Sequence, residues 1–250
     1  MRYIYETHLH TREGSRCGRV HGEDYIPYMI EKGYSGMVVT DHFFTGNCAV
    51  PHFLPWEERV DMYMSGYERA LKAAEGTDFT VLFGIEYNFE CDEYLIYGVD
   101  RKWLLDRPDI EKMTRSEVYG EVHKAGGIMV QAHPYRERDY ISVIHLTPSV
   151  CDGIEIYNAA NGDNMNALAY EYSKRLNLPV TAGSDIHYFH DGPMGGMAFD
   201  RKITCMGDFV DAIKKGEGTP VVVDGAITPV LSVGSLLRPV EGPGLPVIEH

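Results

Sequence analysis

The chain has 250 residues and carries 37 acidic against 23 basic side chains, which gives a formal charge of −14. This balance argues against broad binding to nucleic acid or to a membrane surface, because both require a basic face. No apolar run is long enough to span a bilayer, and the N-terminus enters a strand pattern without the apolar core of a signal peptide. We therefore expect a cytoplasmic protein, and the length favours a single domain.

The cysteines are five in number, scattered and without CxxC spacing: Cys17, Cys48, Cys91, Cys151 and Cys205. This usage predicts reduced thiols rather than a disulfide framework. Cys17 and Cys91 lie near the candidate site described below and are possible ligands, but packing is the simpler interpretation.

The first element, Arg2 to Thr11, alternates apolar and polar residues and ends in His8 and His10. Side chains two residues apart in a strand point to the same face. Both imidazoles should therefore leave the strand side by side, where one divalent cation can bind them.

Helix and strand patterns then alternate along the chain. Helices are predicted at Glu23 to Lys32, Trp56 to Ala74, the segment opened by the capping box Thr114 to Glu117, Asp163 to Leu176, and Phe209 to Lys214. The inward helical positions are Ile26, Met29, Ile30, Val60, Tyr63, Tyr67, Leu71, Met165, Leu168 and Tyr172. Strands are predicted at Met37 to Asp41, Phe79 to Ile85, Glu93 to Val99, Ile128 to Gln131, Gly153 to Tyr157, Pro179 to Gly183, and Pro220 to Val223.

This alternation predicts a parallel sheet with right-handed crossovers, and about seven such units favour closure into a barrel. We expect residues 1–224 to form this single α/β barrel domain. Residues 225–250 are rich in proline and glycine and should pack on the barrel as an irregular arm.

Metal-ligand residue types close most of the predicted strands: His42, Glu86, His133, Glu155, Asp185 and His187. Active sites of barrel enzymes form at the carboxyl ends of the strands, so these side chains should converge on one rim. Imidazole and carboxylate together suit Zn²⁺, Mn²⁺ or Fe²⁺, whereas Mg²⁺ and Ca²⁺ prefer oxygen ligands alone.

The motifs THLHT, TDH, GIE, AHPYR, GIEIYN and GSDIH, in this order from about Tyr3 to Val223, resemble those of the PHP family, named for polymerase and histidinol phosphatase. The resemblance implies a distorted (β/α)7 TIM-like barrel that carries two or three divalent metal ions (Zn, Mn or Fe). It also implies metal-dependent hydrolysis of phosphate esters.

Carried over by position, the resemblance implies three groups of ligands. They are His8, His10, Glu86 and Asp185 for one metal, the bridging Glu86 and His133 for a second, and His42 and His187 for a third. The family often has an aspartate or histidine shortly after HxHT, and Glu13 is the best local substitute here. It also usually has a histidine where this chain has Cys91 to Tyr94. The alternatives are that Asp92 or Glu93 serves the second metal or that the second site is weak.

Two residues are expected to contact the substrate. Arg136 follows His133 by three residues and has the bidentate geometry that suits a phosphate, the alternative being a surface salt bridge to Glu137 or Asp139. His190 follows His187 by three residues on the same loop.

We expect a hydroxide between two ions to attack a small phosphomonoester such as histidinol phosphate. One alternative is a nucleotide phosphatase or exonuclease of the same family. Another is a non-catalytic metal-binding module, although open ligand sets are unusual for structural metal.

The expected partner is a small phosphorylated substrate, with no long nucleic acid and no membrane.

Overall fold

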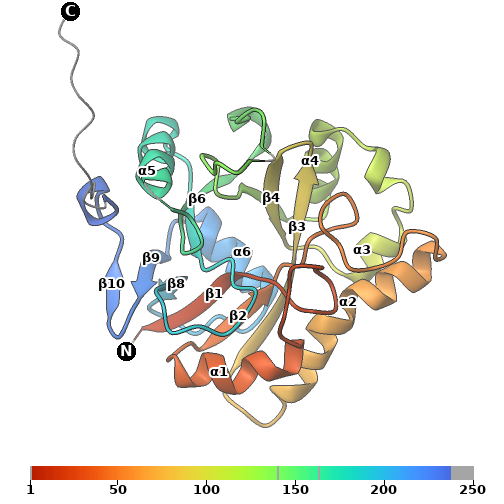
Figure 1. Ribbon diagram of the computed structural model, residues 1–250, viewed down its shortest axis with the longest axis horizontal. Coiled ribbons are helices and arrows are strands. Elements are labelled where there is room, and N and C mark those ends of the chain that lie inside the picture. Colours follow the sequence, from red (N-terminus) through yellow and green to blue (C-terminus); the bar gives the residue numbers. More distant parts are fainter. Residues whose placement is uncertain (1, 140, 163, 238–250) are drawn as a thin grey trace, which may run out of the picture.

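The computed structural model describes residues 2–139, 141–162 and 164–237 of the chain. Within these ranges ten strands form one sheet, in the order β10-β9-β8-β1-β2-β3-β4-β5-β6-β7 (Figure 1). The strands are β1 (Tyr3–Leu9), β2 (Gly36–Val39), β3 (Thr80–Phe89), β4 (Asp92–Tyr97), β5 (Ile128–Gln131), β6 (Gly153–Asn158), β7 (Val180–Gly183), β8 (Met194–Phe199), β9 (Thr219–Val223) and β10 (Ile227–Pro229).

The helices join and cover these strands. They are α1 (Tyr25–Glu31), α2 (Trp56–Ala73), α3 (Arg101–Leu105), α4 (Arg115–Lys124), α5 (Met165–Leu176) and α6 (Met206–Lys214). The capping box before α4 is confirmed, because the Thr114 hydroxyl accepts from the Glu117 N–H while the Glu117 carboxylate accepts from the Thr114 N–H.

The sheet is mixed, so the expectation of an all-parallel (β/α)7 arrangement is wrong. Strand β4 runs antiparallel to both β3 and β5, and β8 runs antiparallel to β1 and β9. Only Glu90 and Cys91 separate β3 from β4, and Glu90 has the positive φ of a tight turn. A parallel crossover needs a dozen or more residues, so this connection has to be a hairpin.

The sheet curls until the end of β1 meets the segment that follows β7. The Ile186 N–H donates to the His8 carbonyl at 3.3 Å, and the His10 N–H donates to the Ile186 carbonyl at 3.0 Å. Close packing at two glycines allows this approach: a Cβ on Gly183 would lie 2.5 Å from the Cβ of His8, and one on Gly195 would lie 2.2 Å from the Gly183 carbonyl oxygen. The result is a curled, half-barrel sheet whose rim gathers the ends of β1 and β7.

The predicted apolar stripes are confirmed for most helical positions and wrong for three. Ile26, Met29, Val60, Tyr63 and Met165 are buried, whereas the exposed ones are Ile30, Leu71 and Leu168. The predicted start of the fourth helix, Asp163, lies outside the described residues.

Two elements of the C-terminal half were not predicted. Strand β8 has the sequence MGGMAF, in which two glycines hide the strand pattern. Strand β10 lies in the segment expected to be an irregular arm, and it pairs with β9 instead. The rest of that predicted arm, residues 238–250, lies outside the described residues. None of the helices in the described ranges has the length and apolar character needed to cross a membrane.

The close approach at Gly195 predicts opposite effects for two glycine substitutions. Gly195→Ala should lower the free energy of unfolding by about 2 kcal/mol or more, because the added methyl group overlaps the Gly183 carbonyl. Gly120→Ala, in the middle of α4 with open space around it, should raise the same quantity by about 0.5–1 kcal/mol. Urea denaturation of both variants measures these changes, and equal effects would contradict the packing described here.

Candidate metal centre

The carboxylate of Glu86, in β3, is the hub of a buried cluster of imidazoles. Its Oε1 lies 3.0 Å from His8 Nε2 and 3.2 Å from His133 Nε2. Its Oε2 lies 2.7 Å from His42 Nδ1 and 3.3 Å from His10 Nε2. One carboxylate therefore faces four histidines from three other strand ends, as expected for a bridging ligand.

The carboxylate of Asp185, which follows β7, is the second negative charge of the cluster. Its Oδ1 lies 3.1 Å from His10 Nε2 and 3.6 Å from His8 Nε2. Its Oδ2 accepts from the Arg136 guanidinium at 2.7 Å. The arrangement leaves Oδ1 for a cation and holds the other oxygen in place.

Four overlapping groups of side chains have ligand atoms close enough to share a metal ion, within 4.8 Å of one another. The groups are His10, His42 and His187; His8, Glu86 and His133; His8, His10 and Asp185; and His42, Glu86 and Glu93. Within the described part of the chain, several of their buried atoms have no hydrogen-bond partner: His8 Nε2, His10 Nε2, His42 Nδ1 and Glu86 Oε2. Buried polar atoms are normally satisfied, so this concentration fits a divalent metal cluster.

Hydrogen bonds behind the cluster fix which ring nitrogens can bind. The Nδ1–H of His8 donates to Glu155 at 2.9 Å, and that of His10 donates to the Ser15 hydroxyl at 3.0 Å. The Nδ1–H of His187 donates to the Asp185 carbonyl at 2.8 Å. Each Nε2 is thereby left with a free lone pair, which is how proteins orient metal-binding histidines.

The charges of the cluster are strongly coupled. Burial alone would raise the pKa of Glu86, but His42 and His8 hold it well below its usual range. Burial would likewise raise the pKa of Asp185, which Arg136 and His8 hold well below its usual range. Burial would lower the pKa of His8, whereas Glu155 and Asp185 raise it well above its usual value. The buried, ionised carboxylates are therefore stable only beside positive charge, which protons or metal ions can supply.

Two of the candidate ligands have strained backbones. His133 has a φ of +28° and Asp185 a φ of +55°, which L-residues rarely adopt. Such conformations cost about 1–3 kcal/mol each and are concentrated at functional sites.

Comparisons with known proteins agree with this picture. Residues 164–217 match the family model described as PHP-associated. The fold is similar to that of a two-domain protein containing a predicted PHP-like metal-dependent phosphoesterase from Bacteroides vulgatus, with a TM-score of 0.63 and 13% identity over 88% of this chain and 64% of that one. Both findings agree with the resemblance of the sequence motifs to the PHP family. No curated protein matches the sequence.

Two further solved structures have the same fold at lower similarity. One, described as a metal-dependent phosphoesterase, is from Bifidobacterium adolescentis, with a TM-score of 0.50 and 16% identity over 74% of this chain and 87% of that one. The other is the lesion-specific endonuclease PfuEndoQ from Pyrococcus furiosus, with a TM-score of 0.51 and 14% identity over 92% of this chain and 58% of that one. This chain therefore spans less than two thirds of the Bacteroides protein and of the endonuclease.

The structure brings together seven of the eight ligands expected from the PHP motifs: His8, His10, His42, Glu86, His133, Asp185 and His187. Glu13 is not among the grouped residues. Its carboxylate instead accepts from His21 at 2.5 Å and pairs with Arg69 at 3.3 Å. The expectation that Glu13 substitutes for a family ligand therefore has no support in its contacts.

The Arg136 side chain is only 10% exposed, and its ion-pair partner is Asp185 rather than the neighbouring Glu137 or Asp139. It also donates to Asn161 at 3.0 Å and to Asn158 at 2.9 Å. The guanidinium is therefore positioned to hold a metal ligand, and its contact with a phosphate stays a prediction.

A cavity of about 670 Å³ lies beside the cluster and is lined by Cys17, Arg19, Asp185, His187 and His190, among others. The Nδ1 of His190 accepts from the Gly192 N–H at 3.1 Å, which leaves its Nε2 as the protonated nitrogen. His190 thus lies where a substrate can reach it, as predicted from its loop position, although its contact with substrate stays a prediction.

The sequence did not single out Ser15 as a support, whereas Cys17 was expected near the site. Ser15 accepts from His10 and from the His42 N–H and donates to Asp41 at 2.7 Å. Burial alone would raise the pKa of Cys17, but hydrogen bonds with His187 and His42 lower it to about 6. The sequence signal for both residues was a serine and a cysteine, Ser15 and Cys17, within six residues of the end of the HxHT motif.

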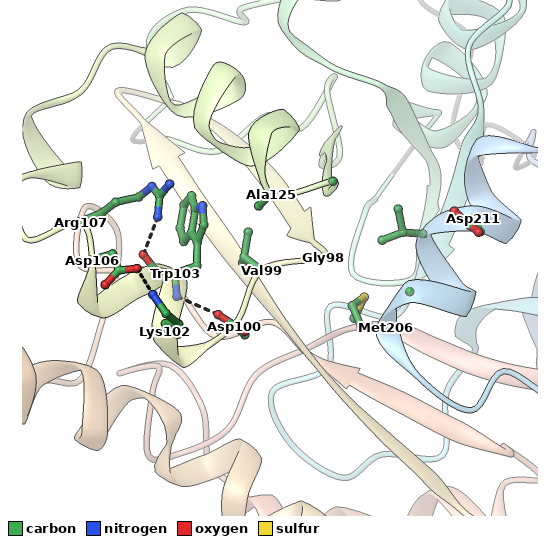
Figure 2. Close-up of a pocket in the computed structure, with 13 residues that line it drawn as sticks. Gly98, Val99, Asp100, Lys102, Trp103, Asp106, Arg107, Ala125, Met206 and Asp211 are labelled. Atoms are coloured by element: carbon green, nitrogen blue, oxygen red, sulfur yellow. Dashed lines mark hydrogen bonds and ion pairs between the residues drawn. The ribbon is translucent and has the colours of Figure 1, made fainter.

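A separate cavity of about 490 Å³ lies between α3, the end of α4 and α6 (Figure 2). Its charged side chains are engaged locally, since Lys102 pairs with Asp106 and Arg107 donates to the Trp103 carbonyl. None of the metal-binding groups found among the described residues includes a residue of this cavity.

Neighbouring carboxylates after β3 allow a matched test of the second metal group. Glu93 lies 3.5 Å from His133 and 3.7 Å from His42, whereas Asp92 pairs with Arg115 at 2.7 Å and accepts from Tyr94. Glu93→Gln should therefore reduce the metal content per chain and Asp92→Asn should leave it unchanged. Elemental analysis after dialysis measures this content, and the reverse ranking would refute the assignment.

Proposed function

We propose that this protein is a metal-dependent phosphoesterase that hydrolyses a small phosphomonoester such as histidinol phosphate. The observation that carries the proposal is the set of buried ligand atoms around Glu86 that make no hydrogen bond to the described residues. This set lies next to an open cavity of about 670 Å³. The similarity to proteins described as metal-dependent phosphoesterases supports it.

Two or three divalent ions (Zn, Mn or Fe), when bound, would supply Lewis acidity and bring the pKa of a water close to neutral. The chain's own residues prepare this chemistry. Glu155 and Ser15 orient His8 and His10 through their Nδ1–H groups. Arg136 fixes the carboxylate of Asp185 and offsets part of the negative charge that an incoming phosphate must approach.

The cavity wall provides groups for the substrate itself. Arg19 is exposed there and forms no ion pair within the described ranges, so its guanidinium is free to pair with a phosphate oxygen. His190 accepts from the Gly192 N–H through Nδ1, so its Nε2–H can donate a hydrogen bond to a substrate oxygen. These two residues therefore complement the buried ligands.

Activity should follow the buried ligands. Purified protein loaded with Zn²⁺ or Mn²⁺ should hydrolyse p-nitrophenyl phosphate and at least one member of a panel of natural phosphomonoesters. His133→Ala and Asp185→Ala should lower kcat/KM by at least about 100-fold, since even outer partners of metal ligands are worth about 10–100-fold. His123→Ala, which removes a surface imidazole paired with Asp152, is the matched control.

Two results would contradict the proposal. One is a folded, metal-loaded protein that leaves the whole panel untouched, which would favour a non-catalytic metal-binding module. The other is hydrolysis that survives in both ligand variants, because turnover would then come from another site.

Arg19 and Arg16 allow a test of phosphate recognition at equal change of charge. Both are exposed on the loop after β1, but only Arg19 lines the cavity. Arg19→Ala should raise KM roughly tenfold, in line with the loss of one solvent-exposed charged hydrogen bond, while Arg16→Ala should leave it unchanged. Steady-state kinetics at constant ionic strength separates the two, and identical KM values in both variants would remove Arg19 from the phosphate site.

A nucleotide phosphatase or exonuclease is the second candidate, and the similarity in fold to the Pyrococcus endonuclease favours keeping it. The formal charge of −14 disfavours long nucleic acid but not mononucleotides. Release of nucleotides from a single-stranded oligomer, compared with release of phosphate from mononucleotides, distinguishes these reactions.

A further inference from the structure

Glu155, in β6, is fully buried and turns both of its carboxylate oxygens towards candidate metal ligands. Its Oε1 lies 2.9 Å from His8 Nδ1, and its Oε2 accepts from the main-chain N–H of His133 at 3.0 Å. Oε2 also accepts from Asn158 Nδ2 at 3.0 Å. One carboxylate therefore contacts two candidate ligands that come from different strand ends.

Each of these three partners presents a donor to Glu155. The N–H of His133 can only donate, and His8 has to carry its proton on Nδ1 if its Nε2 is to bind a metal ion. The amide of Asn158 also has its nitrogen towards Glu155, because its Oδ1 accepts from Arg136 at 2.9 Å. An ionised carboxylate accepts at both ends and satisfies all three donors, whereas a carboxamide has a donor at one end and cannot.

The contact with the His133 N–H holds a strained stretch of backbone. His133 has a φ of +28°, and such a conformation persists only where the surrounding contacts fix it. Glu155 binds the N–H of this residue, and its carbonyl accepts from the Arg136 N–H at 2.9 Å. These two hydrogen bonds direct the ring of His133 towards Glu86, whose Oε1 lies 3.2 Å from its Nε2.

The groups of possible metal ligands differ in how far they depend on Glu155. It contacts two of the three side chains in the group of His8, Glu86 and His133. Another group contains neither of these two histidines and consists of His10, His42 and His187. In that group the Nδ1 atoms of His10 and His187 have other partners. A change at Glu155 should therefore affect the metal positions unequally.

We propose that Glu155 is the positioning residue of the metal ion held by His8, Glu86 and His133. It fixes the proton of one imidazole through Oε1 and the backbone of the other through Oε2. This inference rests on the metal cluster of the proposed function and concerns a side chain that does not itself bind the ion. The position formed by His10, His42 and His187 does not require Glu155.

Zinc binding to Glu155→Gln tests this selectivity and needs no substrate. If the new NH₂ group faces His8, the imidazole has to accept on Nδ1 and carry its proton on Nε2, which then cannot bind zinc. If it faces His133, two donors meet and the strained N–H loses its acceptor. Competition with a chromophoric chelator should show at least one zinc ion bound about 10–100-fold more weakly than in the unaltered protein, while another keeps its affinity.

Nitrogen-15 NMR of the histidines distinguishes positioning from a general loss of stability. In the zinc-loaded, unaltered protein His8 should bind zinc through Nε2, and its Nδ1–H should resonate far downfield because it donates to a carboxylate. In Glu155→Gln this resonance should move upfield or disappear. The Nδ1–H resonance of His10, which contacts Ser15 instead, should stay in place.

Glu13→Gln is the matched control. Glu13 also has a carboxylate that accepts from a histidine Nδ1, that of His21 at 2.5 Å. Neither of these residues belongs to the groups of possible metal ligands found in the described part of the chain. The zinc affinities and the His8 resonance should therefore be unchanged in this variant.

Two results would overturn the inference. One is a Glu155→Gln variant with the zinc affinities and the His8 resonance of the unaltered protein. The other is an equal weakening of every zinc ion, because Glu155 would then act on the fold of the whole rim. If the variant does not fold, the unaltered protein decides: zinc bound to His8 through Nδ1, or a His8 without the downfield Nδ1–H resonance, would equally overturn it.

The proposed function can fail separately from this inference. A selective loss of zinc affinity in Glu155→Gln, in a protein that hydrolyses no phosphate ester, would keep the role of Glu155 and remove the reaction. Unchanged zinc binding in that variant, together with phosphatase activity of the unaltered protein, would remove the role of Glu155 alone.

Discussion

The structure depends on the burial of the Glu86 carboxylate. A buried ion costs several kcal/mol unless opposite charge and hydrogen bonds offset that cost. Here the offset comes from four imidazoles that contact the two oxygens of Glu86, and it extends to Asp185 through His8 and His10. The cluster is therefore stable only when cations lie among these side chains. The same buried charges therefore govern both metal binding and the stability of the strand ends that carry them.

The curl of the sheet brings the carboxylates of Glu86 and Asp185 together. Glu86 lies in a strand near the middle of the row and Asp185 follows the last strand, yet both contact His8. The contact requires the curl that Gly183 and Gly195 permit by close packing. It also requires Asp185 to adopt a positive φ, so part of the folding energy is retained as local strain at the site. The cluster is thus assembled by the overall curvature as much as by the individual strands.

What could be predicted from the sequence follows from the range of the interactions. The places of most strands, the Thr114 cap and the side-by-side geometry of His8 and His10 depend on neighbours within a few residues, and these were predicted, although β3 continues past its predicted end at Ile85 to Phe89. The reversal at β4 and the glycine-rich β8 depend on pairing between distant strands, which periodicity does not encode. The choice between Asp92 and Glu93 depends on which face of β4 meets the cluster, and that was only visible once the pairing with β3 was known.

The absence of Glu13 from the grouped ligands has a similar origin. Counted along the chain, Glu13 is closer to the HxHT motif, but the loop is a tight turn in which a Cβ on Gly18 would lie 2.2 Å from the Thr11 carbonyl oxygen. That turn directs Glu13 towards Arg69 and His21 and away from the cluster. The imidazole of His42 lies 2.7 Å from Glu86 and 3.7 Å from Glu93, so it is shared by two carboxylates. A change of charge at one of these carboxylates therefore alters the charge felt at the other ligands of the cluster.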